Sequence, residues 1–177
     1  MVSRAHRAEL SLTEWTVLGV VAERPTHGWP VVQELAPEGA IGRIWTVSRP
    51  LVYRALATLT VGGLIEECGE VEGARGPRRT IVRATRAGRA ALRWWLDEPV
   101  DHVREVRSTL LVKLALRERA GRDSSALIDR QLDRLEPVLA AVTRRGSHGG
   151  FDAVLGSWRR EQALAVRRFL RAQADTS

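Results

Sequence analysis

Arginine side chains fill two stretches of the chain that contain no carboxylate. The first stretch lies between Glu38 and Glu66, and the second lies between Glu72 and Asp97. The arginines they contain are Arg43, Arg49 and Arg54 in the first, and Arg75, Arg78, Arg79, Arg83, Arg86, Arg89 and Arg93 in the second. A guanidinium group gains free energy by neutralising a phosphate and releasing counterions, whereas a nearby carboxylate would repel that phosphate. The two stretches therefore favour a surface for a polyanion over a merely solvated charged face.

The overall composition agrees with a folded, basic protein. The 177 residues include 28 Lys plus Arg against 21 Asp plus Glu, which gives a formal charge of +7. With 44% hydrophobic and 28% charged residues, the chain has the composition of a globular protein and not of a disordered one. Its longest apolar stretches, residues 15–22 and 110–116, are far shorter than the ~20 residues that span a bilayer. No cleavable signal pattern opens the chain and Cys68 is its single cysteine, so we expect a cytoplasmic protein without disulfides or a membrane segment.

The sequence contains no motif that indicates catalysis, a cofactor or a metal. Phosphate-loop, dinucleotide-binding and Ser-His-Asp signatures are absent from it. The four histidines, His6, His27, His102 and His148, do not pair at helical spacing with one another or with Cys68. We therefore expect a protein that is not an enzyme and that needs neither metal nor cofactor.

Three helices are predicted in the first third of the chain. Ser11 and Glu14 form a capping box at the start of a helix over residues 12–22, and a second helix is predicted over residues 28–35. Ser48 can cap a third helix with Pro50 in its first turn. In that helix Val52, Leu56 and Leu59 share one face, which should be buried, and residues 62–63 are glycines that end it.

A β-hairpin follows these helices. Residues 64–71 and 78–84 have β-type composition, and the turn-forming residues 72–77 lie between them. Three helices and a hairpin within about 75 residues match a winged helix-turn-helix domain, whose third helix enters the major groove of DNA. Both acid-free stretches cover the elements that such a domain docks on DNA.

The rest of the chain is predicted to be helical. After a helix over residues 85–97, a fifth helix contains Val106, Leu110 and Leu114 and ends at Gly121. The sixth helix has a heptad-like seam of apolar residues, Ile128, Leu132, Leu135, Leu139 and Val142, and should be kinked at Pro137. The seventh helix has a similar seam of Phe151, Leu155, Trp158, Ala165 and Phe169. We therefore predict a mainly α protein with a small hairpin wing. Residues 1–98 form the winged helix-turn-helix DNA-binding domain and residues 99–177 a C-terminal α-helical dimerisation domain.

These residues resemble the PadR family of bacterial transcriptional regulators over about residues 12–98. The motifs that carry the resemblance are Val17-Leu18-Gly19-Val20-Val21, His27-Gly28-Trp29, Leu51-Val52-Tyr53-Arg54-Ala55-Leu56, Leu59, Gly63-Leu64-Ile65 and Thr85-Arg86-Ala87-Gly88. The helical C-terminal half is similar to the subfamily with an extended dimerisation region. The resemblance implies a homodimeric repressor that binds double-stranded operator DNA and is often released by a small molecule.

Candidate binding residues follow from the fold and the resemblance together. For DNA they are Trp29, Ser48, Arg49, Leu51, Tyr53, Arg54, Arg75, Arg78 and Arg79, with either Arg49 or Arg54 able to read a base or to contact a phosphate. For an aromatic or drug-like effector they are Trp15, Trp94, Trp95 and Trp158, which could equally be core or interface residues. The alternatives to a DNA-binding regulator are a winged helix that serves as a protein-interaction scaffold and a single-stranded nucleic-acid binder.

Overall fold

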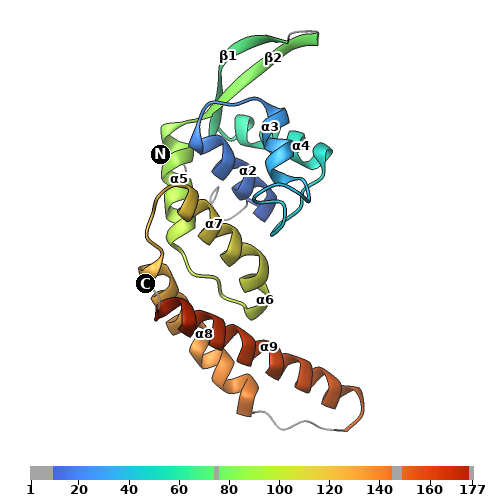
Figure 1. Cartoon of the computed structure of the whole chain (residues 1–177), viewed down its shortest axis with the longest axis vertical. Coiled ribbons are helices and arrows are strands. Elements are labelled where there is room, and N and C mark those ends of the chain that lie inside the picture. Colours follow the sequence, from blue (N-terminus) through green and yellow to red (C-terminus); the bar gives the residue numbers. More distant parts are fainter. Residues whose placement is uncertain (1–9, 74–75, 145–148, 176–177) are drawn as a thin grey trace. The chain divides into compact units, whose positions relative to one another are not determined.

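The chain divides into two compact units, residues 1–96 and residues 97–177. The computed structural model describes residues 10–73, 76–144 and 149–175 (Figure 1). The first unit contains α2 (Leu12–Glu23), α3 (Gly28–Leu35), α4 (Arg49–Val61), β1 (Ile65–Gly73), β2 (Gly76–Ala84) and α5, which ends at the unit boundary (Arg86–Asp97). The second contains α6 (Val103–Glu105), the π-helical segment η1 (Val106–Leu110), α7 (Leu111–Arg119), α8 (Ser125–Arg144) and α9 (Phe151–Ala174). The predicted fold class, mainly α with a two-stranded hairpin wing, is confirmed.

The side-chain cap predicted for the first helix is present, and the one predicted for the third helix is not. At α2 the capping box is present, because the Glu14 amide donates to the Ser11 hydroxyl at 3.3 Å and the Ser11 amide donates to the Glu14 carboxylate at 2.7 Å. At α4 Ser48 is the N-cap residue, but its side chain makes no capping hydrogen bond. Pro50 in the first turn has no N–H to donate, which removes one of the amides that a capping side chain ordinarily serves.

The core of the first unit is formed by α2, whose residues 15–21 are all buried, together with the apolar faces of α3, α4 and α5. Val52 and Leu59 are fully buried and Leu56 is 9% exposed, so the predicted apolar face of α4 is confirmed. The rings of Trp15 on α2 and Trp95 on α5 stack with their centroids 5.2 Å apart and their planes 7° apart. Such a pair contributes about 0.5–1.5 kcal/mol beyond the area it buries.

The Thr-x-x-Gly motif after the wing has a structural explanation. The Thr85 hydroxyl donates to the carbonyl of Gly63 at 2.8 Å and accepts from the amide of Gly88 at 3.0 Å, so it fixes the start of α5 against the end of α4. A Cβ on Gly88 would lie 2.0 Å from the carbonyl oxygen of Leu64. Only glycine permits this close approach of two backbones.

The wing is an antiparallel hairpin with an irregular register. Ile65 pairs with Ala84 at its base, and the register shifts between Glu67 and Gly69 and again between Val71 and Gly73. The base is also paired with the segment before α3, since Thr26 and Val82 exchange backbone hydrogen bonds of 3.0 and 2.8 Å. The wing is therefore tied to the same segment that leads into α3.

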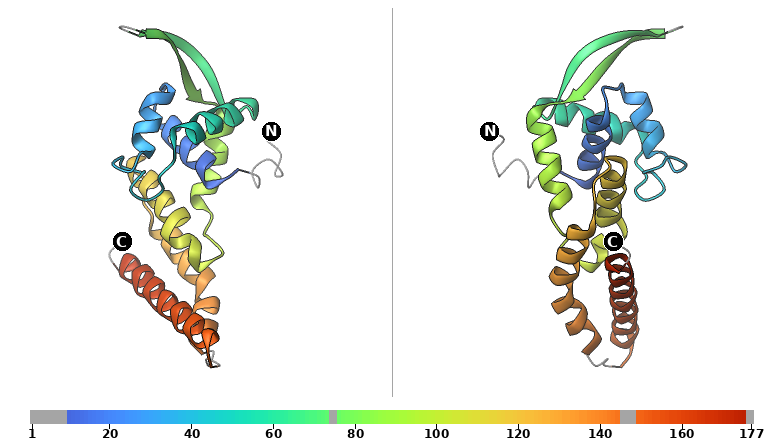
Figure 2. Two further views of the ribbon diagram at one scale, coloured as in Figure 1. Left: turned by 90° about the vertical axis from the view of Figure 1, so that its right-hand side faces the viewer. Right: turned by 60° about the vertical axis from the view of Figure 1, so that its left-hand side comes forward.

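The second unit is built on the antiparallel pair α8 and α9 (Figure 2). The fifth predicted helix is present as a continuous helical stretch over residues 103–119, whose middle part η1 is π-helical, and it ends near Gly121, whose φ is 63°. Pro137 lies inside α8, as predicted. None of the described helices has the length and apolarity needed to cross a bilayer.

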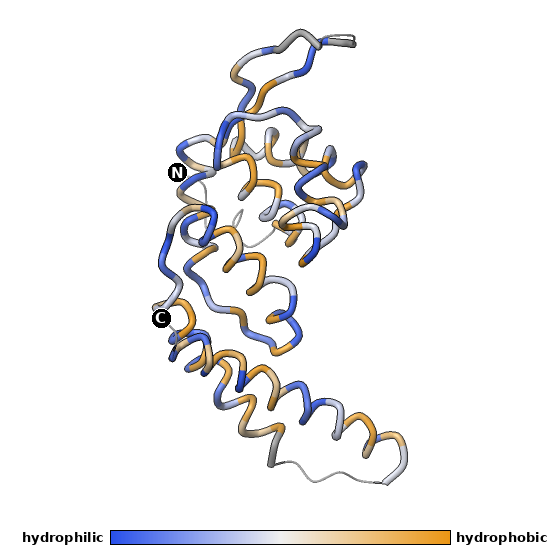
Figure 3. The backbone as a smooth tube through the Cα atoms, in the orientation of Figure 1, coloured by the Kyte–Doolittle hydropathy of each residue, from blue (hydrophilic) through white to orange (hydrophobic). Residues whose placement is uncertain are grey.

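The predicted seam of α9 packs within this chain only in part. Phe151 is 76% exposed and Trp158 is 61% exposed, whereas Phe169 packs against the core, which Ala163 and Leu170 enter. A heptad pattern identifies an apolar face, but it does not say which helix covers that face. Apolar residues recur along the whole length of α9 (Figure 3), so the helix has apolar surface beyond what α8 covers.

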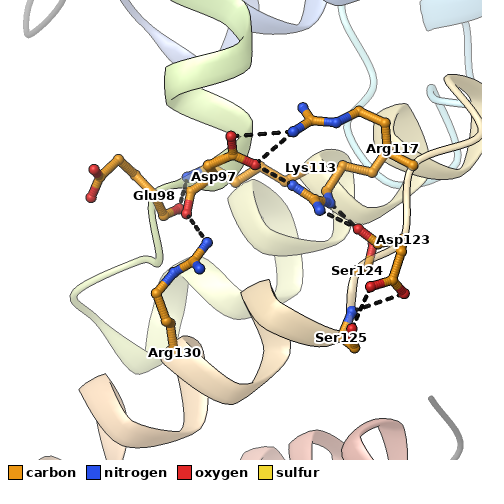
Figure 4. Close-up of polar contacts among 9 residues, drawn as sticks. Asp97, Glu98, Lys113, Arg117, Asp123, Ser124, Ser125 and Arg130 are labelled. Carbon is orange, nitrogen blue, oxygen red and sulfur yellow. Dashed lines mark hydrogen bonds and ion pairs between the residues drawn. The ribbon is translucent and has the colours of Figure 1, made fainter.

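The single lysine of the chain lies inside the second unit. Lys113 is 2% exposed, and its Nζ donates to the carbonyl of Glu98 at 2.5 Å (Figure 4). Burial lowers the pKa of Lys113 from its ordinary value of 10.5 to about 8, although the neighbouring carboxylates of Glu98 and Glu105 act in the opposite direction. The folded protein therefore loses this proton at a lower pH than the unfolded chain does.

We predict that this difference makes stability depend on pH in the alkaline range. Between pH 8 and 10.5 the unfolded chain holds more protons at Lys113, so the free energy of unfolding rises with pH, by up to ~3 kcal/mol at about 1.4 kcal/mol per pKa unit. Urea denaturation of the wild type and of Lys113→Met across this range should show the rise only in the wild type. Equal slopes in the two proteins would contradict the assignment.

Candidate nucleic-acid interface

Helix α4 separates its buried residues from its charged ones. Val52 and Ala55 are buried, while Tyr53 is 43% exposed and Leu51 is 37% exposed. Ser48, Arg49 and Arg54 are exposed as well. The candidate residues at the start of α4 and along it are thus exposed, and a ligand can reach them without any change in the core.

A groove runs between the start of α3, the outer side of α4 and strand β2. Its volume is about 570 Å³. The residues that line it are His27, Gly28, Trp29, Arg49, Tyr53, Leu56, Ala57, Thr60, Glu67, Arg78, Arg79, Thr80 and Val82. We call this surface the α4–wing groove. It brings together Trp29, Arg49, Tyr53, Arg78 and Arg79 from the predicted set.

Two aromatic rings hold Arg49 in the groove. The guanidinium carbon of Arg49 lies 5.8 Å from the ring centroid of Trp29 and 5.7 Å from that of Tyr53. Each cation–π contact at an exposed site is worth about 0.5–1 kcal/mol. The guanidinium is thereby oriented before any ligand arrives, and it keeps its N–H donors for an anion.

Gly28 sets the position of Tyr53. A Cβ at Gly28 would lie 2.6 Å from Cε1 of Tyr53 and 3.2 Å from its hydroxyl oxygen. The ring of Tyr53 can therefore occupy its place beside Arg49 only because residue 28 has no side chain. Gly28 and His27 are not among the predicted site residues, although both belong to the His27-Gly28-Trp29 motif.

Two arginines of β2 form ion pairs with glutamates of β1. Arg78 pairs with Glu70 at 3.1 Å and Arg83 pairs with Glu66 at 2.8 Å, and these side chains are all about half exposed or more. Exposed ion pairs contribute only about 0–1 kcal/mol, so a phosphate can compete for either arginine. The predicted site residue Arg75 lies outside the described residues.

The four tryptophans predicted for an effector occupy different environments. Trp15 is 4% exposed and Trp95 is 7% exposed, and each covers one face of the other's ring. Trp94 is 42% exposed, in agreement with the rotation of about 100° between neighbouring residues of a helix. Trp158 belongs to α9 of the second unit and is exposed. Among the described residues there is no group of three or more His, Cys, Asp or Glu side chains that could hold a metal ion.

The chain is similar to known transcriptional regulators. Residues 17–94 match the model of the transcriptional regulator PadR-like family. A structure of Bacillus subtilis PadR in complex with operator DNA is 16% identical, with a TM-score of 0.49 over 94% of this chain and 99% of that chain. The protein smu.1604c from Streptococcus mutans UA159 is 15% identical, with a TM-score of 0.44 over 90% of this chain and 96% of that one.

A third similar structure is Bacillus subtilis PadR in complex with p-coumaric acid. It is 15% identical, with a TM-score of 0.42 over 93% of this chain and 94% of that chain. No curated protein matches the sequence.

The close contact at Gly28 leads to a prediction about the groove. Gly28→Ala should displace the ring of Tyr53 and leave stability almost unchanged, by less than ~1 kcal/mol, because the ring is at the end of a partly exposed, flexible side chain. NMR shifts of the Tyr53 ring and thermal denaturation measure the two effects. Gly69→Ala is the matched control, since a Cβ there meets no atom within 4 Å. A Tyr53 ring that stays in place in Gly28→Ala would contradict the prediction.

Proposed function

We propose that this chain is a sequence-specific regulator that binds operator DNA, because residues 17–94 match the model of the transcriptional regulator PadR-like family. It acts as a homodimeric repressor that a small molecule releases. The observation that carries the proposal is the α4–wing groove, in which Arg49 is held by two aromatic rings beside two arginines of β2.

In this proposal α4 lies in the major groove and the wing contacts the flanking backbone. Arg49, Arg78 and Arg79 line the α4–wing groove and contact phosphates. Arg54 lies outside that groove on the exposed side of α4, and it reads a base, since a guanidinium can donate two hydrogen bonds to one guanine. Phosphate contacts supply most of the affinity and the base contact supplies sequence preference.

The second unit forms the dimer in this proposal. Phe151, Val154 and Trp158 are 76%, 63% and 61% exposed, and all three are on the first half of α9. A row of large apolar side chains in water is typical of an interaction surface. Its heptad spacing fits a second copy of the same helix, and a two-fold dimer matches a palindromic operator.

The effector in this proposal is an aromatic or drug-like molecule. A flat apolar ligand can stack on Trp94 or Trp158, because both rings are exposed. Trp15 and Trp95 would first have to separate from each other, which makes core packing their role in the unliganded protein.

We predict different DNA-binding defects for two arginine variants. Arg54→Ala should weaken binding to the preferred operator by roughly 1–3 kcal/mol and relax the sequence preference, because it removes a base contact. Arg78→Ala should weaken binding to all duplexes alike and lower the slope of log K against log salt by about 1, because it removes a phosphate contact. Fluorescence anisotropy on the preferred operator and a shuffled duplex, at several salt concentrations, measures both effects.

The matched control for these variants is Arg171→Ala, which removes an exposed arginine from α9 and should leave DNA binding unchanged. An Arg54→Ala variant with the wild-type sequence preference would assign the base contact to another residue. If neither variant nor wild type binds duplex DNA, the protein-interaction scaffold becomes the better interpretation.

The dimer proposal predicts the effect of one change in the exposed row of α9. Trp158→Glu should convert the dimer to a monomer, because it places a charge in the apolar interface. Sedimentation equilibrium should show this change for Trp158→Glu and not for Val61→Glu, which introduces the same charge at a 91% exposed valine of α4. A Trp158→Glu protein that remains dimeric would show that the row is not the interface.

A further inference from the structure

The α4–wing groove contains a carboxylate among its arginines. Glu67 lines it together with Arg49, Arg78 and Arg79, and no other acidic residue of the described part of the chain does. Glu67 is exposed and belongs to β1, in the short acidic segment that separates the two acid-free stretches of the sequence. The fold therefore brings a negative charge into a surface where the sequence pattern indicated only positive ones.

Backbone pairing fixes the place of Glu67 beside the groove. Glu67 is paired with Val82 of β2, which also lines the groove, and residues paired across an antiparallel ladder have their side chains on the same face. The backbone of Val82 in turn exchanges two hydrogen bonds with Thr26, just before α3. Val82 is thus paired on both sides, so the base of the wing holds Glu67 next to the residues that begin α3.

The side chain of Glu67 has no cationic partner, unlike two other glutamates of β1. Glu66 pairs with Arg83 at 2.8 Å and Glu70 pairs with Arg78 at 3.1 Å, so each of them cancels a charge. Within residues 10–73, 76–144 and 149–175, the side chain of Glu67 makes neither a hydrogen bond nor an ion pair. An unpaired carboxylate keeps its full charge and offers only hydrogen-bond acceptors, so it repels a phosphate.

Two of the cations in the groove are already held by other partners. The guanidinium of Arg49 lies against the rings of Trp29 and Tyr53, and that of Arg78 is paired with Glu70. Neither of these contacts involves Glu67. Its charge is therefore not consumed inside the protein, and a ligand that enters the groove meets it.

We propose that Glu67 limits the strength with which the α4–wing groove binds the DNA backbone. Its charge opposes the attraction between phosphates and the three arginines of the groove, so the protein binds every duplex less tightly than those arginines would allow. The effect does not depend on base sequence, because every phosphate carries the same charge. This inference rests on the proposed function, in which a duplex occupies the groove.

Coulomb's law gives the expected size of the effect. One unit charge a few ångströms from a phosphate, in a medium close to water, changes the binding constant on the order of three- to tenfold. Salt screens this repulsion, since the screening length falls from about 10 Å at 0.1 M to about 3 Å at 1 M ionic strength. The contribution of Glu67 should therefore shrink steadily as the salt concentration is raised.

The variant Glu67→Gln tests the proposal, because it removes the charge and nearly keeps the shape of the side chain. We expect it to bind the preferred operator and a shuffled duplex about three- to tenfold more tightly than the wild type at 0.1 M salt, with a smaller gain at higher salt. Fluorescence anisotropy titrations of the full-length protein measure these affinities. A gain in affinity cannot be produced by a loss of folding, so a damaged protein would not mimic the expected result.

Two control variants separate the charge of Glu67 from its shape and from the net charge of the protein. Glu67→Asp keeps the charge on a shorter side chain and should bind both duplexes within twofold of the wild type. Glu161→Gln removes an exposed charge from α9 and should leave DNA binding unchanged. An equal gain in Glu67→Gln and Glu161→Gln would mean that only net charge matters, and the proposal would be refuted.

The remaining outcomes distinguish this proposal from the function on which it rests. If the wild type binds DNA and Glu67→Gln shows no gain, the role assigned to Glu67 is wrong and the proposed function stands. A loss of binding confined to the preferred operator would also refute the proposal, because the carboxylate would then accept a hydrogen bond from a base, such as the amino group of cytosine. A folded wild type that binds no duplex would overturn the proposed function and this inference together.

Discussion

Helix α4 can bury only one of its faces, and the first unit is arranged around that constraint. Val52, Ala55 and Leu59 take the inner face into the core. Arg49 and Tyr53 are therefore left on the outside, where the hairpin and the start of α3 bound the same groove. The rest of the unit supports this placement through the Trp15–Trp95 stack and the Thr85 hydrogen bonds that join the end of α4 to α5. The side chains of Arg49 and Tyr53 can face solvent because the apolar face of α4 is buried in the core.

The second unit is shaped by a different constraint. It contains a short stretch of partly buried backbone whose N–H and C=O groups need hydrogen-bond partners. Residues 97–101 run past α7 and α8, so their carbonyls and the Val100 amide need partners other than water. Lys113 and Gln131 supply those partners, and both are among the buried polar residues of the unit. Burial in this position also disfavours the charged form of Lys113 and lowers its pKa to about 8. The burial of Lys113 and Gln131 is thus explained by the hydrogen bonds that both make to this one segment.

The sequence predicts local features of this fold well, because they depend on neighbouring residues. The capping box at Ser11 and Glu14 and the buried face of α4 are both set within one or two helical turns. The exposure of Phe151 and Trp158 on α9 and the stack of Trp15 on Trp95 depend on how distant parts of the chain pack, which the periodicity of one segment does not show. The same holds for the Gln131 contact, which joins residues 31 positions apart. At the candidate site, the exposure of the α4 residues could be predicted from the sequence, whereas the close approach of Tyr53 to Gly28 appears only in the folded chain.

The central claim is that α4 and the wing read double-stranded DNA. Selection of binding sites by the full-length protein from a pool of random duplexes tests it most directly. The account predicts enrichment of a palindromic motif whose half-sites are separated by one helical turn, about 10 bp, or a multiple of it. A pool that shows no enriched motif after selection, with the protein folded, would contradict the account.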